Sequence, residues 1–304
     1  MIEVLLQAAV LVACGVVWRV LRPFGLEADN MRHVLSGLVY GLLLPALVLK
    51  VLTQVSLEIN ALRIALLAAG GVGFALLLTA VVCRACKTPR PAAGALLLAA
   101  AFGNVTYLGL PVLESVFGHW ANEVAIEYDL FASTPLLLTV GVLLAQRYGG
   151  AREHDSFLFS LLKVPPLWAA LLAILLNLGH VPISHWINGL LDRLAAGVVP
   201  LMLIVVGLGL AWQRGWAKRL TLLVPLLWIK LLLLPLWVWW LAHAIGMQGD
   251  LLAAVVLEAA MPSMVLGIVL CDRYHLDSAL YAEAVTVSTA LAVLTLPGWL
   301  ALLR

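Results

Sequence analysis

Charge is scarce in this 304-residue chain, and its scarcity excludes most classes of soluble protein. Charged residues make up 11% of the sequence, whereas soluble domains typically carry roughly 25%. Hydrophobic residues make up 64%, and the mean hydropathy is +1.08. The formal net charge is only +2, so nothing indicates a nucleic acid as a partner. The composition predicts a protein embedded in a lipid bilayer.

Cysteine is rare as well, and the few cysteines do not form a recognisable site. The chain has four, Cys14, Cys83, Cys86 and Cys271. Cys83 and Cys86 form a single C-x-x-C pair, whereas a zinc or redox site of this kind needs a second pair or nearby histidines. No phosphate loop, Ser–His–Asp order or zinc-protease helix motif is convincing. We therefore expect no metal, no cofactor and no enzymatic activity.

Long apolar runs are what the sequence does contain. About 20 mostly apolar residues span a bilayer. Ten runs of that kind cover residues 2–21, 33–53, 61–83, 92–117, 124–147, 159–179, 188–212, 219–245, 250–271 and 279–303. The first run is longer than the apolar core of a signal peptide, about 7–15 residues, so we expect it to be retained. The predicted fold class is all-α, an integral membrane protein with ten transmembrane helices.

The distribution of basic residues predicts the orientation of these helices. Most Lys and Arg residues lie in the odd-numbered connections, among them Arg19, Arg84 and Arg147. The even-numbered connections are poor in basic residues and hold carboxylates such as Glu123 and Asp250. Because positively charged loops remain in the cytoplasm, we expect both termini to lie on the outer side of the membrane.

The chain also predicts an internal repeat of inverted topology. Its longest polar stretch lies in the middle, so residues 1–148 and 159–304 hold five expected helices each, joined by a short cytoplasmic linker at 149–158. An odd number of helices per half gives the second half the opposite orientation, which is typical of secondary transporters. Proline recurs in the second helix of each half, as Pro45 and Pro200.

Two of the expected spans are interrupted at matching positions. The fourth contains the segment Asn104–Pro111 and the ninth the segment Ala260–Gly267, and Asn104 aligns with Pro262. Proline lacks the N–H donor of a helix, and glycine loosens the helix. In lipid, the freed backbone groups need partners inside the protein or in a water-filled cavity. Such interruptions in corresponding helices point to a binding site near the middle of the membrane.

The interrupted helices favour an anionic ligand. Helix N-termini present N–H groups and the positive end of the helix dipole, so two converging ends would bind a carboxylate. The residues expected to bind the substrate are Asn104, Val105, Thr106, Tyr107, Gly109, Pro111, Met261, Pro262, Ser263 and Met264. The alternative is that the interruptions are kinks that serve packing only, as we expect at Pro235 and Pro297.

Three ionisable residues lie within expected spans, where charge is costly. Lys230 is near the middle of the eighth span, and its candidate partners are Glu258, just ahead of the ninth-span interruption, and Asp129 in the fifth span. A lysine–carboxylate pair could couple a proton or sense an anionic substrate. The alternative is a structural pair, or a lysine that reaches the interface. Lys50 and Arg63 flank a short outer connection, so we expect them to anchor the interface.

These residues resemble the auxin efflux carrier family of secondary transporters, in its compact bacterial form. The resemblance covers nearly the whole chain and is sharpest at Asn104–Pro111, at Met261–Pro262 and in the tail Ser288–Pro297. The family pattern in the fourth helix is close to Asn-x-Gly-x-Leu-Gly-x-Pro. Here Thr106 and Tyr107 occupy the middle of that pattern, a difference that bears on the substrate more than on the fold.

The resemblance implies a fold similar to that of the bile acid–sodium symporters, with the fourth and ninth helices crossing at their breaks. Helices 1, 2, 6 and 7 would form a scaffold domain. Helices 3–5 and 8–10 would form a transport domain that moves like an elevator. Members are often homodimers that assemble through the scaffold, and the compact bacterial form implies a bacterial cytoplasmic (inner) membrane. Bacterial members are associated with small organic anions such as malate and malonate, and the plant branch exports auxin.

The leading hypothesis is therefore a secondary transporter of a small organic anion, a mono- or dicarboxylate, with or without a coupled proton. One alternative is sodium-coupled symport of an organic acid, with oxygen ligands from Asn104, Thr106, Ser263 and Glu258. Another is a membrane sensor that binds its ligand at the same site. A sensor usually carries an output domain or docking segment, and the sequence shows neither.

Overall fold

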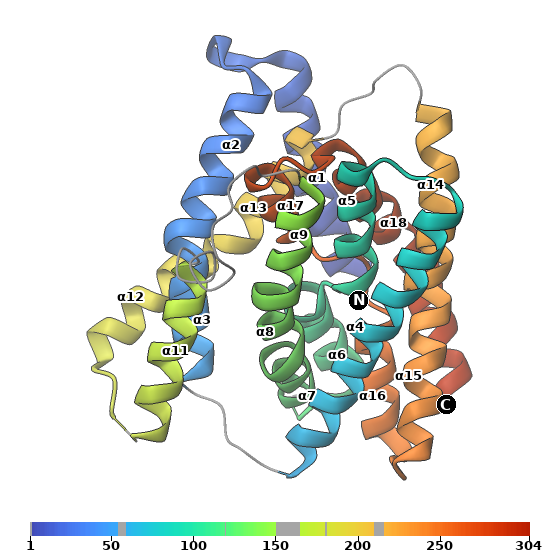
Figure 1. The fold of residues 1–304 in the computed structure, drawn as a ribbon. Coiled ribbons are helices and arrows are strands. Elements are labelled where there is room, and N and C mark those ends of the chain that lie inside the picture. Colours follow the sequence, from blue (N-terminus) through green and yellow to red (C-terminus); the bar gives the residue numbers. More distant parts are fainter. Residues whose placement is uncertain (1, 54–58, 119, 150–164, 180, 210–215) are drawn as a thin grey trace.

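The computed structural model describes residues 2–53, 59–118, 120–149, 165–179, 181–209 and 216–304 (Figure 1). Nearly all of these residues are helical, and among them no strand occurs apart from one isolated bridge between Gly103 and Ser263. The structure therefore confirms an all-helical chain. The linker expected at 149–158 lies outside the described residues except for its first residue.

The described helices follow one another in two halves. Those of the first half are α1 (Ile2–Leu21), α2 (Ala28–Leu38), α3 (Leu44–Leu52), α4 (Ile59–Ala85), α5 (Arg90–Ala101), α6 (Leu110–Phe117), α7 (Ala121–Tyr128), α8 (Thr134–Leu136) and α9 (Val142–Gly149). Those of the second half are α11 (Pro165–Leu178), α12 (His185–Ala196), α13 (Val198–Gly209), α14 (Trp216–Trp228), α15 (Leu234–Ala244), α16 (Gly249–Ala259), α17 (Gly267–Arg273) and α18 (Ser278–Leu303).

Within the described ranges, six continuous helical stretches are long and apolar enough to cross a membrane. They are Ala28–Lys50, Asn60–Ala85, Glu123–Gly149, His185–Gly209, Arg219–Ala244 and Ser278–Leu303. Two shorter apolar helices are Ala9–Leu21 and Arg90–Ala101. The structure thus supports an integral membrane protein, while the count of ten spans stays a prediction.

Several boundaries differ from those expected. The second span begins at Ala28 rather than at residue 33, because its polar first turn continues the helix beyond the apolar run. The fourth and ninth expected spans each divide into two shorter helices, α5 with α6 and α16 with α17. The sixth expected span is described only from Pro165 onward.

Wide turns interrupt the helices just before prolines. Four π-helical turns share this placement, Val39–Leu43, Val105–Gly109, Asp129–Ser133 and Ile229–Leu233. The second residue after each of them is a proline. Because proline has no N–H and its ring crowds the preceding turn, the helix widens at these places. Such turns often mark functional sites.

The helices pack into two groups in Figure 1. α2, α3, α11 and α12 lie on the left, and α4 to α9 with α14 to α18 lie on the right. α11 packs along α3, and α1 packs along α13. α1 and α13 approach each other closely, because a Cβ atom at Gly15 of α1 or at Gly207 of α13 would overlap the backbone of the other helix. Small residues allow such close approach of helices in membranes.

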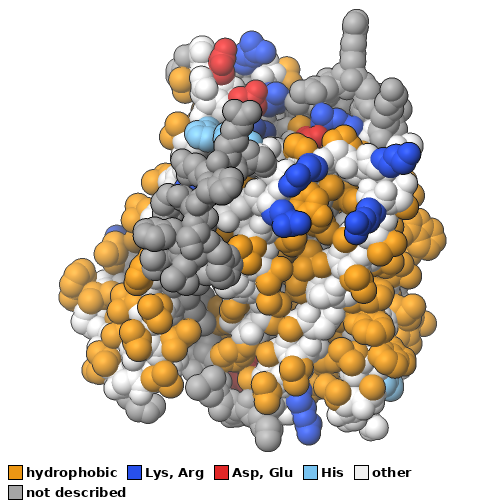
Figure 2. Space-filling model, viewed as in Figure 1, with side chains coloured by type: hydrophobic (Ala, Val, Ile, Leu, Met, Phe, Trp, Pro, Cys, Tyr) orange, Lys and Arg blue, Asp and Glu red, His pale blue; other side chains and the backbone are white. Residues whose placement is uncertain are grey.

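The surface carries the pattern of a membrane protein. Hydrophobic side chains cover most of the visible face, while Lys and Arg side chains gather towards its upper end (Figure 2). Large apolar side chains such as Leu77, Leu175 and Leu294 are more than half exposed. An exposed apolar belt of this extent indicates contact with lipid rather than water.

Candidate functional site

The two interrupted spans cross through their non-helical segments. There the backbones run antiparallel, and two hydrogen bonds join them. The Asn104 N–H donates to the Pro262 carbonyl oxygen at 2.8 Å, and the Met264 N–H donates to the Phe102 carbonyl oxygen at 2.8 Å. Each break thus supplies hydrogen-bond partners for backbone groups of the other break that have none within a helix. A buried backbone in a membrane requires such partners.

A cavity of about 440 Å³ lies beside this crossing. Its walls come from α3, from the first break, from α7 with the wide turn after it, and from the second break. The polar lining consists of Lys50, Asn104, Thr106, Glu123, Glu127, Asp129 and Thr134. Leu44, Val48 and Met264 are among the apolar residues of the lining. The cavity therefore joins α3 of one helix group to the crossing in the other.

Asp129 is held at the cavity wall by two hydroxyl groups. The Thr106 hydroxyl donates to Asp129 Oδ2, and the Thr134 hydroxyl donates to Oδ1 at 2.9 Å. The wide turn Asp129–Ser133 aims this carboxylate at the first break instead of at lipid. The expectation that Asp129 could be a partner of Lys230 is replaced by this contact, since among the described ion pairs none includes either residue.

Lys230 is buried behind the crossing and does not line the cavity. Its side chain is 1% exposed, and Nζ lies 3.0 Å from the point where a Cβ atom of residue 103 would stand. Glycine at position 103 therefore makes room for the ammonium group. The wide turn that carries Lys230 is itself fixed from α18, because Trp299 Nε1 donates to the Leu231 carbonyl oxygen at 2.8 Å.

Like Lys230, Glu258 is buried beside the crossing and lies against a glycine. Its side chain is fully buried against Gly109, where an added methyl group would overlap the carboxylate. Neither carboxylate oxygen has a hydrogen-bond partner among the described residues. Lys230 and Asp129 are close enough to act on it electrostatically.

The second break is enclosed by α18. The Ser263 N–H donates to the Ser288 hydroxyl at 3.1 Å, and the Tyr281 hydroxyl donates to the Met264 carbonyl oxygen at 2.6 Å. The ring of Tyr281 lies against Gly267, where any side chain would overlap it. Residues 260–270 are all buried. This segment is thus braced from behind by side chains of another helix.

The structure places the residues expected from the sequence in two layers. Asn104, Val105, Thr106, Met264 and Asp129 line the cavity. The second layer lies outside the lining and comprises Gly109, Lys230, Glu258, Met261, Pro262 and Ser263. The side chains of Tyr107 and Pro111 lie outside the described part of the structure. The expected convergence of two helix N-termini stays a prediction; helical structure begins at Val105 after the first break and at Gly267 after the second.

Four polar residues of the lining were not predicted as site residues from the sequence. Glu123, Glu127 and Thr134 lie within one or two turns of Asp129 in the sequence, so helical periodicity around that residue could have indicated them. Lys50 was expected only as an interface anchor, yet it lines the cavity and pairs with Asp192 at 2.6 Å. No local pattern shows that α3 faces the first break.

Comparison with known proteins identifies the family of the chain. The model of a family described as membrane transport protein matches residues 2–151 and 152–300. An uncharacterised transporter of Methanothermobacter thermautotrophicus is 34% identical over 206 residues, 67% of this chain and 66% of the relative. An uncharacterised transporter of Methanocaldococcus jannaschii is 30% identical over 224 residues, which are 69% of this chain and 68% of the relative.

A more distant relative is the uncharacterised transporter YfdV of Escherichia coli, 23% identical over 203 residues, 65% of this chain and 64% of the relative. The chain thus spans about two thirds of the length of the curated relatives it matches. These relatives are described as transporters and not as enzymes. The family match covers almost every residue, so the chain belongs to the membrane transport protein family, that of the auxin efflux carriers.

Proposed function

We propose that this membrane transporter moves a small organic anion by alternating access, with its site at the crossing of the interrupted helices. The observation that carries the proposal is the cavity of about 440 Å³ lined by Asn104, Val105 and Thr106. This volume lies within the range of about 300–1,000 Å³ typical of small-molecule sites. The cavity reaches the crossing itself, since Asn104, Val105 and Met264 belong to its lining.

The first break supplies the groups that would bind a carboxylate. Helical structure starts at Val105 and continues through the wide turn into α6. The first N–H groups of such a stretch have no acceptor within the helix, and they attract negative charge. The side-chain amide of Asn104 stands beside them and can donate as well. A carboxylate therefore finds several donors in one place.

The charge of the lining favours a monocarboxylate. Glu123, Glu127 and Asp129 line the cavity together with Lys50, and Lys50 is already paired with Asp192. A second carboxylate on the substrate would meet these acidic groups in a medium of low dielectric constant, where like charges repel strongly. A compact monocarboxylate with an apolar body fits both the donors and the leucine-rich wall.

For the architecture, we infer two inverted repeats of five helices, with α1–α3 and α11–α13 as a scaffold around which the other helices move like an elevator. The reciprocal packing supports this, since the first helix of each half packs along the second helix of the other half. The gathering of basic side chains at one end (Figure 2) supports a cytoplasmic position for that end and outer termini in the inner membrane. Assembly as a homodimer through the scaffold is part of the same proposal.

Sodium-coupled symport is the second candidate, and one observation favours it. Asn104 Oδ1 is buried without a partner among the described residues, and it lines the same cavity as Thr106 and the carboxylate of Asp129. Clusters of amide, hydroxyl and carboxylate oxygens are the usual ligands of sodium in transporters. Sodium would then enter with the anion and offset the charge of Asp129.

The test is uptake by purified protein in liposomes. Labelled monocarboxylates and dicarboxylates of similar size are compared, each with and without a sodium gradient, for the wild type and Asn104→Ala. We expect uptake of a monocarboxylate that is at least about tenfold weaker in the variant, because a lost donor to a charged group costs about 1.5–3 kcal/mol.

Two results would contradict the proposal. One is an absence of flux for every organic anion by folded protein, which would favour a sensor. The other is equal flux in Asn104→Ala, which would move the site away from the crossing. Uptake that depends on the sodium gradient would select symport, and uptake indifferent to the gradient would exclude it.

A further inference from the structure

A second polar cluster lies at the opposite end of the helix span that borders the cavity. The continuous span Ala28–Lys50 carries Arg32 and Ser36 in its first half, while Leu47 and Lys50 in its second half line the cavity. At 1.5 Å per residue, Ser36 and Leu47 are about 16 Å apart along the helix axis. The cluster and the cavity are therefore separate sites on one helix.

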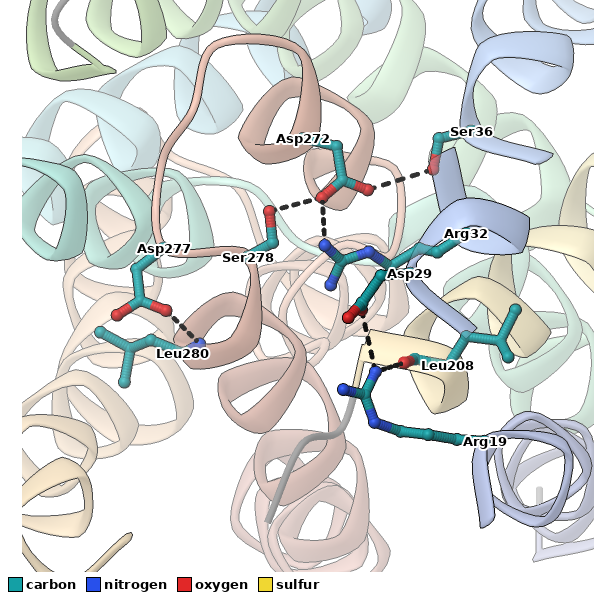
Figure 3. Close-up of polar contacts among 9 residues, drawn as sticks. All are labelled: Arg19, Asp29, Arg32, Ser36, Leu208, Asp272, Asp277, Ser278 and Leu280. Atoms are coloured by element: carbon teal, nitrogen blue, oxygen red, sulfur yellow. Dashed lines mark hydrogen bonds and ion pairs between the residues drawn. The ribbon is translucent and has the colours of Figure 1, made fainter. Parts of the chain in front are cut away.

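Asp272 is the centre of this cluster (Figure 3). Arg32 NH2 of α2 lies 3.1 Å from Asp272 Oδ1, and the Ser36 hydroxyl of α2 donates to Oδ2 at 3.3 Å. From α18, the Ser278 hydroxyl donates to Oδ1 at 2.6 Å. The side chain of Asp272 is only 4% exposed. The carboxylate at the end of α17 is thus bound to α2 and to α18 at the same time.

The next residue makes a second contact between the same elements. The guanidinium carbon of Arg273 lies 5.1 Å from the centre of the Tyr40 ring, in the wide turn that follows α2. A guanidinium group over an aromatic face is attracted to it. Two consecutive residues at the end of α17 therefore bind to two successive turns of the second span.

A neighbouring cluster provides a contrast at the same end of the molecule. Arg19 NH1 of α1 pairs with Asp29 of α2 at 3.0 Å and donates to the Leu208 carbonyl oxygen of α13 (Figure 3). These contacts stay among α1, α2 and α13, which all belong to the proposed scaffold. Of these two clusters, the Asp272 cluster is the one that joins a scaffold helix to helices of the proposed transport domain.

We propose that Arg32, Ser36, Asp272 and Ser278 form a latch that keeps the basic end of the transporter closed while the cavity at the other end is accessible. Movement of α17 relative to α2 has to separate Arg32 and Ser36 from Asp272. The contact between Ser278 and Asp272 lies within the moving group and persists. The latch rests on the proposed function, both for the division into scaffold and moving helices and for passage of the substrate through this end.

Cys271 offers a reporter beside the latch. Its side chain is fully buried in this closed arrangement, and it precedes Asp272 in α17. In a Cys14→Ser, Cys83→Ala, Cys86→Ser background, a small water-soluble maleimide can react only at Cys271. The rate of alkylation then measures how often the basic end opens, and no substrate is needed.

The experiment compares Arg32→Gln with Arg19→Gln in this background. Loss of the latch charge should speed alkylation of Cys271 by about tenfold, equivalent to about 1.4 kcal/mol. Arg19→Gln removes an ion pair that does not cross between the domains, so its rate should match the background. Removing a nearby positive charge would by itself slow attack by a thiolate, so faster alkylation reports exposure.

Ser36→Ala keeps the test decisive if Arg32→Gln does not fold, as judged by size exclusion and thermal unfolding. It removes one hydroxyl contact and should speed alkylation by about threefold. Unchanged rates in folded Ser36→Ala and Arg32→Gln would overturn the latch, as would equal acceleration in Arg19→Gln. Failure of the proposed function would show instead as absent flux with the alkylation pattern intact.

Discussion

The two breaks that form the crossing look alike in sequence and differ in their surroundings. The first break exposes Asn104, Val105 and Thr106 to the cavity. The second break is buried throughout and is braced by Tyr281 and Ser288 of α18. Backbone hydrogen bonds join the two breaks. The pair is therefore symmetric in its backbone and asymmetric in its side chains.

This difference in surroundings gives the two breaks different roles. The first break carries the groups that meet a ligand, whereas the second holds the first in place and contributes mainly Met264 and Leu266 to the cavity wall. Substitutions in the second break should lower stability. Substitutions in the first should lower binding and leave stability nearly unchanged.

The largest expected effect is a loss of stability on substitution beside the second break. Gly267→Val places a side chain on the buried ring of Tyr281, and overpacking of this kind costs about 3 kcal/mol. Thermal unfolding in detergent should show the loss. Gly73→Val is the matched control, because nothing lies within 4 Å of a Cβ atom there. Equal unfolding temperatures for the two variants would show that the second break is not braced.

The next largest expected effect is a loss of ligand binding on substitution in the first break. Asn104→Ala should weaken binding of the transported anion by at least about tenfold while the unfolding temperature stays close to that of the wild type, because Oδ1 has no partner to lose among the described residues. Ser263→Ala removes an equally buried, unpartnered oxygen from the second break. Ser263→Ala should change neither anion binding nor the unfolding temperature. A loss of binding as large as that in Asn104→Ala would show that the two breaks do not differ in their contact with the ligand.

A smaller effect is expected at the brace itself. Tyr281→Phe deletes the hydrogen bond to the Met264 carbonyl oxygen and leaves the ring in place, so stability should fall by about 1 kcal/mol. Denaturation in detergent measures this change, and uptake in liposomes should remain. Uptake that falls at unchanged stability would give the second break a direct role in binding.

The smallest effect belongs to the rim of the cavity, opposite the first break. Lys50 and Asp192 are 33% and 56% exposed in their side chains, and exposed ion pairs contribute about 0.2–1 kcal/mol. Lys50→Gln should therefore change the KM of uptake by about twofold at low salt, and the change should shrink in high salt. A loss larger than about tenfold would instead place Lys50 on the substrate.

The sequence predicts the helical architecture and the position of the breaks because both follow from local composition. Apolar length indicates spans, and the combination of glycine and proline around Asn104 and Pro262 indicates interruptions. The asymmetry of the breaks could not be predicted, since it depends on Tyr281 of α18 packing on Gly267. The place of Lys50 in the cavity lining could not be predicted for a related reason, because it depends on the approach of α3 to the first break.

Lys230 and Asp129 were predicted as buried charges, with Glu258 as a candidate partner of Lys230, but the hydroxyl partners of Asp129 were not predicted. Each lies in a wide turn, five or six residues before a proline, and that turn changes the direction in which the side chain points. The structure directs Asp129 to Thr106 and places Lys230 against Gly103, within electrostatic reach of Glu258.

The wide turn at Ile229–Leu233 also sets the register of the span that contains it. Such a turn holds one residue more than a regular turn, so the helix after it is rotated by about 100° relative to an unbroken helix. That rotation keeps Trp228 before the turn and Trp240 after it exposed, while Lys230 between them is buried. Deleting the extra residue of this turn would restore a regular helix in which Trp228 and Trp240 still share one face. Relatives that lack the turn will therefore align with this chain only through a one-residue gap near Lys230.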